Sequence, residues 1–370
     1  MKICLLEPFH TGSHAAWAEE FARHSRHQVS LLTLPGRRWK WRMHGGAVTL
    51  ARQFIESGQQ PDLLLASDML DLTSFLALTR KQTAHLPCAL YFHENQLTYP
   101  WSENGAGKDR QLPHYAFINF TSALSADAVL FNSHYHQQSF LTALPEFLKK
   151  FPDHNELQSV EQIRAKSCVL HLGQELKRFD DYRPTDATAE SQRPPLILWN
   201  HRWEYDKNPQ AFFEALYQLQ DEGLNFEVAL LGESFRNGSA VFDQARERLG
   251  ERVVQFGYAE SFADYARWLW RADLLPVTSD HDFFGGSVVQ AIYCGCTPLL
   301  PRRLAYPEHL PPELAESCLF DDYNELTMQL RSLLQGAKRP DAAQLRAHVS
   351  RYDWQELIGQ YDDLLEGLVG

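Results

Sequence analysis

Two stretches of charged and glycine residues carry the strongest chemical signal in the chain. The first places Arg202 and Lys207 after the apolar run 196–199, and the second places Gly285–Gly286 after the segment 273–278. Both runs are typical of buried strands, so both stretches are expected at strand carboxyl ends. Two exposed cations and a glycine-rich helix N-terminus at such an edge form a site for a diphosphate. The alternative is a surface ion-pair network, which fits these strand-end positions less well.

The second stretch also carries side chains suited to a sugar nucleotide. Asp282 is expected to bind sugar hydroxyls. Gln290 lies eight residues later, on the same face, and is expected to bind the ribose diol. The alternative for Asp282 is a carboxylate that only stabilises the helix N-terminus. The predicted donor-binding residues are Gly12, Ser13, Arg202, Lys207, Gly232, Glu233, Tyr258, Phe283, Phe284, Gly285, Gly286, Ser287 and Gln290.

Polar residues also follow two expected strands of the N-terminal half. Gly12 and Ser13 follow the first strand and let a diphosphate or an acceptor approach the next helix, unless Ser13 is simply its N-cap. His93 stands at the start of a polar cluster, which is costly unless it lies at the mouth of a cleft. It could contact a sugar hydroxyl or assist proton transfer. No GxGxxG follows any strand, which argues against a dinucleotide oxidoreductase.

The chain is acidic overall but contains one basic patch. The net charge of −12 argues against sequence-independent binding of nucleic acid. The segment Arg37–Arg42 nevertheless combines four cations with two tryptophans, as a phosphate backbone with stacked bases would require. A solvated turn with its indoles packed inward is the equal alternative. The predicted acceptor-binding residues are His14, Arg38, Trp39, Lys40, Trp41, Arg42, Glu94, Asn95, Gln96 and Ser133, although Ser133 equally suits a helix cap.

No metal or other cofactor is expected. Asp280 and Asp282 flank His281 in a segment assigned to the sugar, and no other Asp-x-Asp stands where it could hold Mg²⁺ on a diphosphate. The six cysteines are scattered, and Cys294-Gly295-Cys296 is interpreted as a turn between a helix and a strand. This cysteine usage fits a reducing cytoplasm, and without an apolar run long enough to span a membrane no membrane partner is expected.

The elements that must position these residues alternate along the chain. Strands are expected at 2–7, 28–34, 62–67, 89–93, 128–132 and 167–172, and again at 196–200, 226–231, 253–256, 274–278, 297–300 and 318–320. Most are continuous apolar runs, which is typical of parallel sheets covered on both faces. Residues 180–195 are expected to link two doubly wound α/β domains, 1–180 and 195–349. The helix within 350–370 is expected to pack back on the first domain, and the active cleft to lie between the domains.

These motifs resemble retaining glycosyltransferases of family four, which have the GT-B fold. Asp282 and Gln290 occupy the positions of two family glutamates spaced eight residues apart. A closer resemblance, to the tRNA-queuosine α-mannosyltransferase family, covers nearly the whole chain. It rests on Gly12–His14, Leu34-Pro35, Lys40–Arg42, Tyr91–Leu97, Phe131–Ser133, Pro152–His154, His201–Lys207 and Tyr293–Cys296.

The resemblance implies GDP-mannose as donor and queuosine in the anticodon of an aspartate tRNA as acceptor. It implies a metal-independent, retaining reaction in which the departing phosphate takes the acceptor proton, with Asp282, His93, Arg202 and Lys207 as catalytic residues. A compact, bacterial-type member acting as a monomer is expected. Two alternatives remain: a GT-B glycosyltransferase acting on a glycan, lipid or small metabolite, and a non-catalytic RNA-binding protein on this scaffold.

Overall fold

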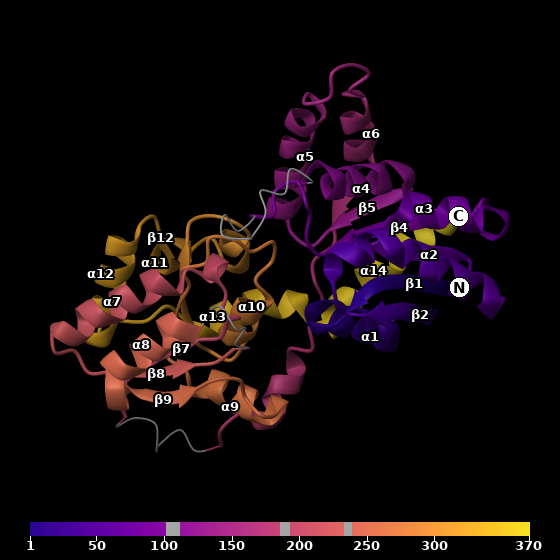
Figure 1. Ribbon diagram of the computed structural model, residues 1–370. Coiled ribbons are helices and arrows are strands. Elements are labelled where there is room, and N and C mark those ends of the chain that lie inside the picture. Colours follow the sequence, from indigo (N-terminus) through magenta and orange to yellow (C-terminus); the bar gives the residue numbers. More distant parts are fainter. Residues whose placement is uncertain (101–111, 186–192, 233–238) are drawn as a thin grey trace. The chain divides into compact units, whose positions relative to one another are not determined.

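Two six-stranded parallel sheets, one in each of two units, form the framework of the computed structural model (Figure 1). The structure describes residues 1–100, 112–185, 193–232 and 239–370. The first unit contains residues 1–174 and 354–370, and the second contains residues 175–353. Helices cover the faces of each sheet, so the prediction of two doubly wound α/β domains is confirmed.

The first unit has the strand order β2-β1-β3-β4-β5-β6. Its strands are β1 (Lys2–His10), β2 (Gln28–Pro35), β3 (Leu63–Ser67), β4 (Cys88–Phe92), β5 (Ala128–Phe131) and β6 (Ser167–Val169). Its helices are α1 (Gly12–His24), α2 (Trp39–Ser57), α3 (Leu72–Thr83), α4 (Leu112–Ser125), α5 (His134–Leu148), α6 (Ser159–Ala165) and α14 (Trp354–Val369). All residues of β3, β4 and β5 are buried, which explains their continuous apolar sequences.

The last helix, α14, belongs to the first unit and covers the same sheet face as α1. Its Trp354 and Tyr361 are fully buried with Trp17 of α1. The Tyr361 hydroxyl donates to the carbonyl oxygen of His171 at 2.7 Å. A Cβ on Gly173 would lie 2.4 Å from the Trp354 ring, so this position requires glycine.

The second unit has the strand order β12-β11-β10-β7-β8-β9. Its strands are β7 (Leu196–Trp199), β8 (Glu227–Leu230), β9 (Val253–Phe256), β10 (Leu274–Pro276), β11 (Thr297–Pro301) and β12 (Leu319–Phe320). Its α-helices are α7 (Pro209–Asp221), α8 (Ser239–Leu249), α9 (Phe262–Arg271), α10 (Gly286–Tyr293), α11 (Ala315–Cys318), α12 (Tyr323–Leu334) and α13 (Ala342–Val349). Its 3-10 helices are η1 (Lys177–Tyr182), η2 (Tyr205–Lys207), η3 (Gly250–Arg252), η4 (Tyr306–His309) and η5 (Ser350–Tyr352).

Two expected boundaries are wrong. β1 continues to His10, because that residue still pairs with Pro35 of β2 beyond an irregularity in the ladder. The linker expected at 180–195 overlaps η1, whose Phe179 is buried and packs against Phe262 of α9, and the second unit already begins at residue 175. The turn at Gly295, with a φ of 91°, joins α10 to β11 as expected. None of the described helices has the length and apolar character needed to cross a bilayer.

Candidate functional site

Lys207 lies beyond the carboxyl end of β7 and is buried. Its Nζ donates to the carbonyl oxygen of His281 at 2.7 Å and lies 3.2 Å from a carboxylate oxygen of both Asp206 and Asp282. Only 8% of the side chain is exposed. The expectation of an exposed Lys207 is therefore wrong, because two carboxylates and a carbonyl replace the water around its ammonium group.

Electrostatic interactions keep both Lys207 and Asp282 ionised. Burial by itself would lower the pKa of Lys207, but Asp282 and Asp206 outweigh burial and raise it. Burial would raise the pKa of Asp282, but Lys207, His201 and the Tyr306 hydrogen bond together outweigh burial and lower it. Tyr306 adds a hydrogen bond from its hydroxyl to Asp282 at 2.7 Å. We call Asp206, Lys207, Asp282 and Tyr306 the Lys207 group, which combines one positive and two negative charges.

Arg202 differs from Lys207 in its access to solvent. Its side chain is 53% exposed, and its guanidinium lies 3.1 Å from a carboxylate oxygen of Glu204. An exposed ion pair of this kind contributes little to stability and can exchange its partner. Arg202 therefore remains able to approach an anionic ligand, as predicted from sequence.

The N-terminus of α10 contacts Asn200 and His201, which directly follow β7. Gly285 is its N-cap with a φ of 84°, and no side chain caps the helix. Asn200 donates to the carbonyl oxygen of Ser287 at 2.7 Å, and the Ser287 hydroxyl lies 3.3 Å from Nδ1 of His201. Since the first amides of a helix lack intrahelical acceptors, Gly285, Gly286 and Ser287 present backbone donors suited to a phosphate.

His201 is a neutral polar group beside this helix end. Burial lowers the pKa of His201 to about 4, against the opposing effect of Asp282. Its Nε2 has no hydrogen-bond partner among the described residues. A buried imidazole nitrogen without a partner is costly, so it is suited to bind a polar ligand atom. The sequence analysis used His201 only within the motif His201–Lys207 and assigned it no role in the site.

The remaining predicted donor residues have different surroundings. A Cβ on Gly232 would lie 2.0 Å from the carbonyl oxygen of His201, so only glycine fits there. Tyr258 is 73% exposed, whereas Phe283 and Phe284 are buried. The Gln290 side-chain oxygen already accepts a hydrogen bond from Tyr265 at 2.8 Å. Glu233 lies outside the described residues.

A second polar group lies at the carboxyl end of β1 in the first unit. His14 Nδ1 lies 3.0 Å from a carboxylate oxygen of Glu7, and the rings of His14 and His93 are 4.1 Å apart. The backbone N–H of His93 donates to Asp68 at 2.8 Å. We call Glu7, His14, Asp68 and His93 the His14 group. All four residues are buried, and the Nε2 of His93 has no partner among the described residues.

Charge interactions set the protonation of the His14 group. Burial would lower the pKa of His14, but Glu7 outweighs it and the pKa rises to about 9. Burial, reinforced by His14, lowers the pKa of His93 well below its usual value. Burial also raises the pKa of Asp68. His93 is thus a neutral imidazole beside a charged one. One ligand atom each from Glu7, His14 and His93 lies within 4.8 Å of the others, a spacing that a metal ion could also use.

The other predicted residues of the first unit include several structural caps. Asn95 is fully buried, and its side-chain oxygen accepts the N–H groups of Leu97 and Thr98 at 3.1 and 3.0 Å. Gln96 is also buried and donates to Glu94 at 2.8 Å. Ser133 is the N-cap of α5, which is the alternative left open by the sequence. Gly12 and Ser13 form the exposed first turn of α1, where Thr11 rather than Ser13 is the N-cap.

The basic segment Arg37–Arg42 leads into α2. Trp39 is half-buried, and its ring centroid lies 5.2 Å from that of Tyr115. Trp41 is 61% exposed, so the inward-packed alternative holds only for Trp39. Within the described part of the chain, Arg37 and Arg38 form no ion pair. The segment therefore presents positive charge and one accessible indole.

Comparison with known proteins agrees with this organisation. Residues 2–174 match the family described as tRNA-queuosine alpha-mannosyltransferase N-terminal. A Drosophila melanogaster protein named tRNA-queuosine alpha-mannosyltransferase is 34% identical over 371 residues, which cover 98% of this chain and 96% of that protein. Since this animal relative is matched over nearly its full length, compactness does not separate this chain from it.

Solved structures share the fold at low identity. Anabaena HepE in complex with UDP is 17% identical with a TM-score of 0.70, covering 99% of this chain and 100% of that chain. Sucrose-phosphate synthase from Thermosynechococcus elongatus is also 17% identical with a TM-score of 0.70, covering 100% of this chain and 99% of that chain. The expected GT-B fold is thereby confirmed.

Proposed function

The chain belongs to the tRNA-queuosine alpha-mannosyltransferase family, and we propose that it transfers mannose from GDP-mannose to queuosine in the anticodon of an aspartate tRNA. The observation that carries the proposal is the 34% identity over 98% of the chain to a relative with that name. The chain is a glycosyltransferase; the donor, the acceptor tRNA, the cytoplasmic location and the monomeric state are parts of the proposal.

The donor assignment is supported by the second unit. Arg202 would bind the diphosphate directly, together with the amides of Gly285–Ser287. Lys207 would add a fixed positive charge, because its ammonium group is held in place before any ligand binds. Preorganised charges of this kind stabilise a leaving group without the cost of reorientation. Asp282 would contact sugar hydroxyls with its remaining acceptor positions.

We propose a retaining reaction without an enzyme nucleophile. Asp282 already accepts a hydrogen bond from Tyr306 and pairs with Lys207, which stabilises its charge and reduces its nucleophilicity. The departing phosphate would then take the acceptor proton, and no metal is required. In the first unit, His93 is neutral and its Nε2 is suited to a hydroxyl.

The direct test is transfer of labelled mannose. Labelled mannose should move from GDP-mannose to tRNA from queuine-fed cells, but not to tRNA from cells that cannot make queuosine. Equal labelling of both pools would refute queuosine as the acceptor. Absence of labelling in both would favour a glycan, lipid or small metabolite as acceptor, or a non-catalytic RNA-binding protein if GDP-mannose is not hydrolysed either.

A pair of double variants tests the tRNA surface. Arg38→Glu combined with Lys40→Glu should weaken tRNA binding strongly at low salt while GDP affinity stays unchanged. The control combines Arg52→Glu on α2 with Lys81→Glu on α3, which are exposed and make the same change of charge elsewhere in the first unit. Equal weakening by both double variants would assign the effect to net charge rather than to the Arg37–Arg42 segment.

A further inference from the structure

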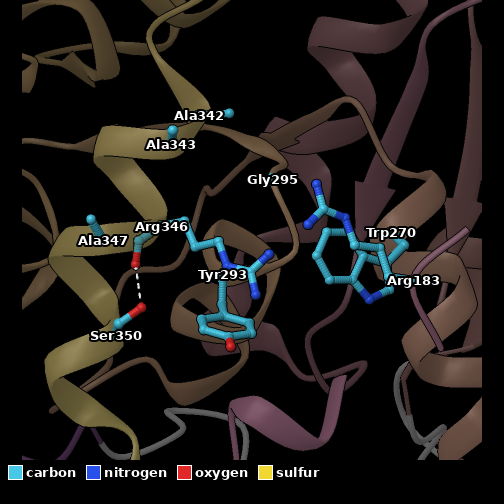
Figure 2. Close-up of a pocket in the computed structure, with 9 residues that line it drawn as sticks. All are labelled: Arg183, Trp270, Tyr293, Gly295, Ala342, Ala343, Arg346, Ala347 and Ser350. Atoms are coloured by element: carbon cyan, nitrogen blue, oxygen red, sulfur yellow. Dashed lines mark hydrogen bonds between the residues drawn. The ribbon is translucent and has the colours of Figure 1, made fainter. Parts of the chain in front are cut away.

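The second unit contains a cavity of about 620 Å³ that none of the donor residues lines (Figure 2). Its walls come from the segment after η1, from the ends of α9 and α10, and from α13. The donor residues lie at the N-terminus of α10, whereas Tyr293 of the cavity lies at its C-terminus. An eight-residue helix is about 12 Å long, so the two sites occupy opposite ends of α10.

Two guanidinium groups and two aromatic rings face one another in this cavity (Figure 2). The Arg183 guanidinium lies 5.1 Å from the Trp270 ring centroid. Arg346 lies 5.2 Å from Trp270 and 4.2 Å from Tyr293. Cations at these distances are attracted to the faces of aromatic rings, so the arginines are held close to the cavity.

The cavity carries an excess of positive charge. Arg346 is paired with Asp180, whose carboxylate also accepts a hydrogen bond from the Tyr293 hydroxyl at 3.0 Å. Arg183 is exposed and pairs with no acidic side chain in the ranges that the structure describes. One of the two guanidiniums thus remains available for an anion.

The opposite wall is small and apolar. Ala343 and Ala347 are four residues apart and line the cavity from one face of α13, where both are exposed. Their methyl groups leave room that larger side chains would fill. The volume lies within the range of about 300–1,000 Å³ that is typical of small-ligand sites.

We propose that this cavity binds a nucleotide, with its base against the aromatic rings and its phosphate on Arg183. Aromatic rings bind bases by stacking, and arginine binds phosphate through charge-assisted hydrogen bonds. The nucleotide could be free in solution or part of an RNA strand, since both present the same base and phosphate. This proposal does not depend on the proposed mannose transfer, because none of the predicted donor-binding residues lines the cavity.

Photo-crosslinking with 8-azido-GMP tests this site, with the labelled peptide identified by mass spectrometry. Label is expected on the peptides that contain Trp270 or Tyr293. The Arg183→Ala variant should need about tenfold more probe for half-maximal labelling, the effect of losing one contact to a charged group. Ala347→Phe should abolish the label by filling the cavity. Arg248→Ala removes an exposed arginine from α8 and should leave labelling unchanged.

Competition distinguishes the two sources of the nucleotide. If unlabelled GMP and a short single-stranded RNA both displace the probe, a free nucleotide suffices. If only the RNA displaces it efficiently, the cavity binds a nucleotide unit within RNA. Labelling confined to other peptides, or labelling that neither Arg183→Ala nor Ala347→Phe reduces, would overturn the proposal.

Discussion

The His14 group and the Lys207 group each hold a buried cation next to acidic side chains, but the two cations differ. Each lies at the carboxyl end of the first strand of its unit, where His14 pairs with Glu7 and Lys207 pairs with Asp206 and Asp282. The cation of the first unit is the imidazolium of His14, whose pKa of about 9 lies in the mildly alkaline range. The cation of the second unit is the ammonium of Lys207, whose pKa is raised above the usual value of a lysine. The second unit therefore carries a permanent charge, and the first a charge that titrates.

Breaking the Lys207 group should produce the largest effect. Lys207→Ala leaves Asp206 and Asp282 as close carboxylates without a cation, and loss of one partner of a buried ion pair costs about 3–5 kcal/mol. Turnover should fall at least 10²–10³-fold as well, the cost of removing a stabiliser of transition-state charge. Urea denaturation and mannose-transfer rates measure the two effects. Unchanged stability would mean that the three charges are not coupled.

Arg202→Ala sharpens the comparison because Arg202 is exposed. Turnover should again fall about 10²–10³-fold, but the free energy of unfolding should stay within about 0.5 kcal/mol, as is usual for surface positions. The two variants thus separate a cation that only acts on the ligand from one that also holds the fold. A variant with normal turnover would remove Arg202 from the diphosphate site.

The sequence predicted these cations but not their environments. Arg202, Lys207 and the glycines of α10 could be found, because strand carboxyl ends and glycine-rich helix starts have local signatures. The burial of Lys207 could not be predicted, because it depends on Asp282, which is distant in sequence. Tyr306 and Asp68 were missed for the same reason: each reaches its group from another strand-to-helix connection.

Overlapping local signals leave two roles open for polar residues of the first unit. The polar residues Asn95 and Ser133 follow strands as binding residues often do, yet each caps a neighbouring turn or helix. Ser, Asn and Asp at strand ends suit both roles, because the same oxygen that binds a ligand can accept a backbone N–H. Sequence alone therefore predicts where the strands end better than it predicts the use of each side chain.

The pH dependence of stability should expose the titrating charge of the His14 group. The pKa of His14 is about 9 in the folded chain and about 6.5 in an unfolded one, so its contribution is complete below pH 6.5. It is lost as the pH rises to 9, by up to about 3 kcal/mol. Glu7→Gln should remove most of this alkaline loss, because Glu7 is the main group that raises the pKa.

The matched control for this experiment is Glu19→Gln, an exposed carboxylate on the same helix as His14. Its stability should keep the alkaline loss of the unmodified chain. Asp282 gives the opposite sign in the second unit: its pKa is lowered, so its contribution is lost as the pH falls below about 4. An alkaline loss that persists in Glu7→Gln would assign the titration to another group.

Chelation should have the smallest effect, and it tests whether either group needs a metal ion. In the Lys207 group, Lys207 already occupies the position between two carboxylates that a divalent cation would take. In the His14 group, the proton shared by His14 and Glu7 competes with a metal, since ligating groups must be deprotonated. Mannose transfer should therefore survive EDTA.

Loss of activity restored by Mg²⁺ or Mn²⁺ would make Asp280 and Asp282 candidate ligands, because these hard cations prefer oxygen. Loss restored only by Zn²⁺, and abolished in Glu7→Gln, would instead locate the metal in the His14 group.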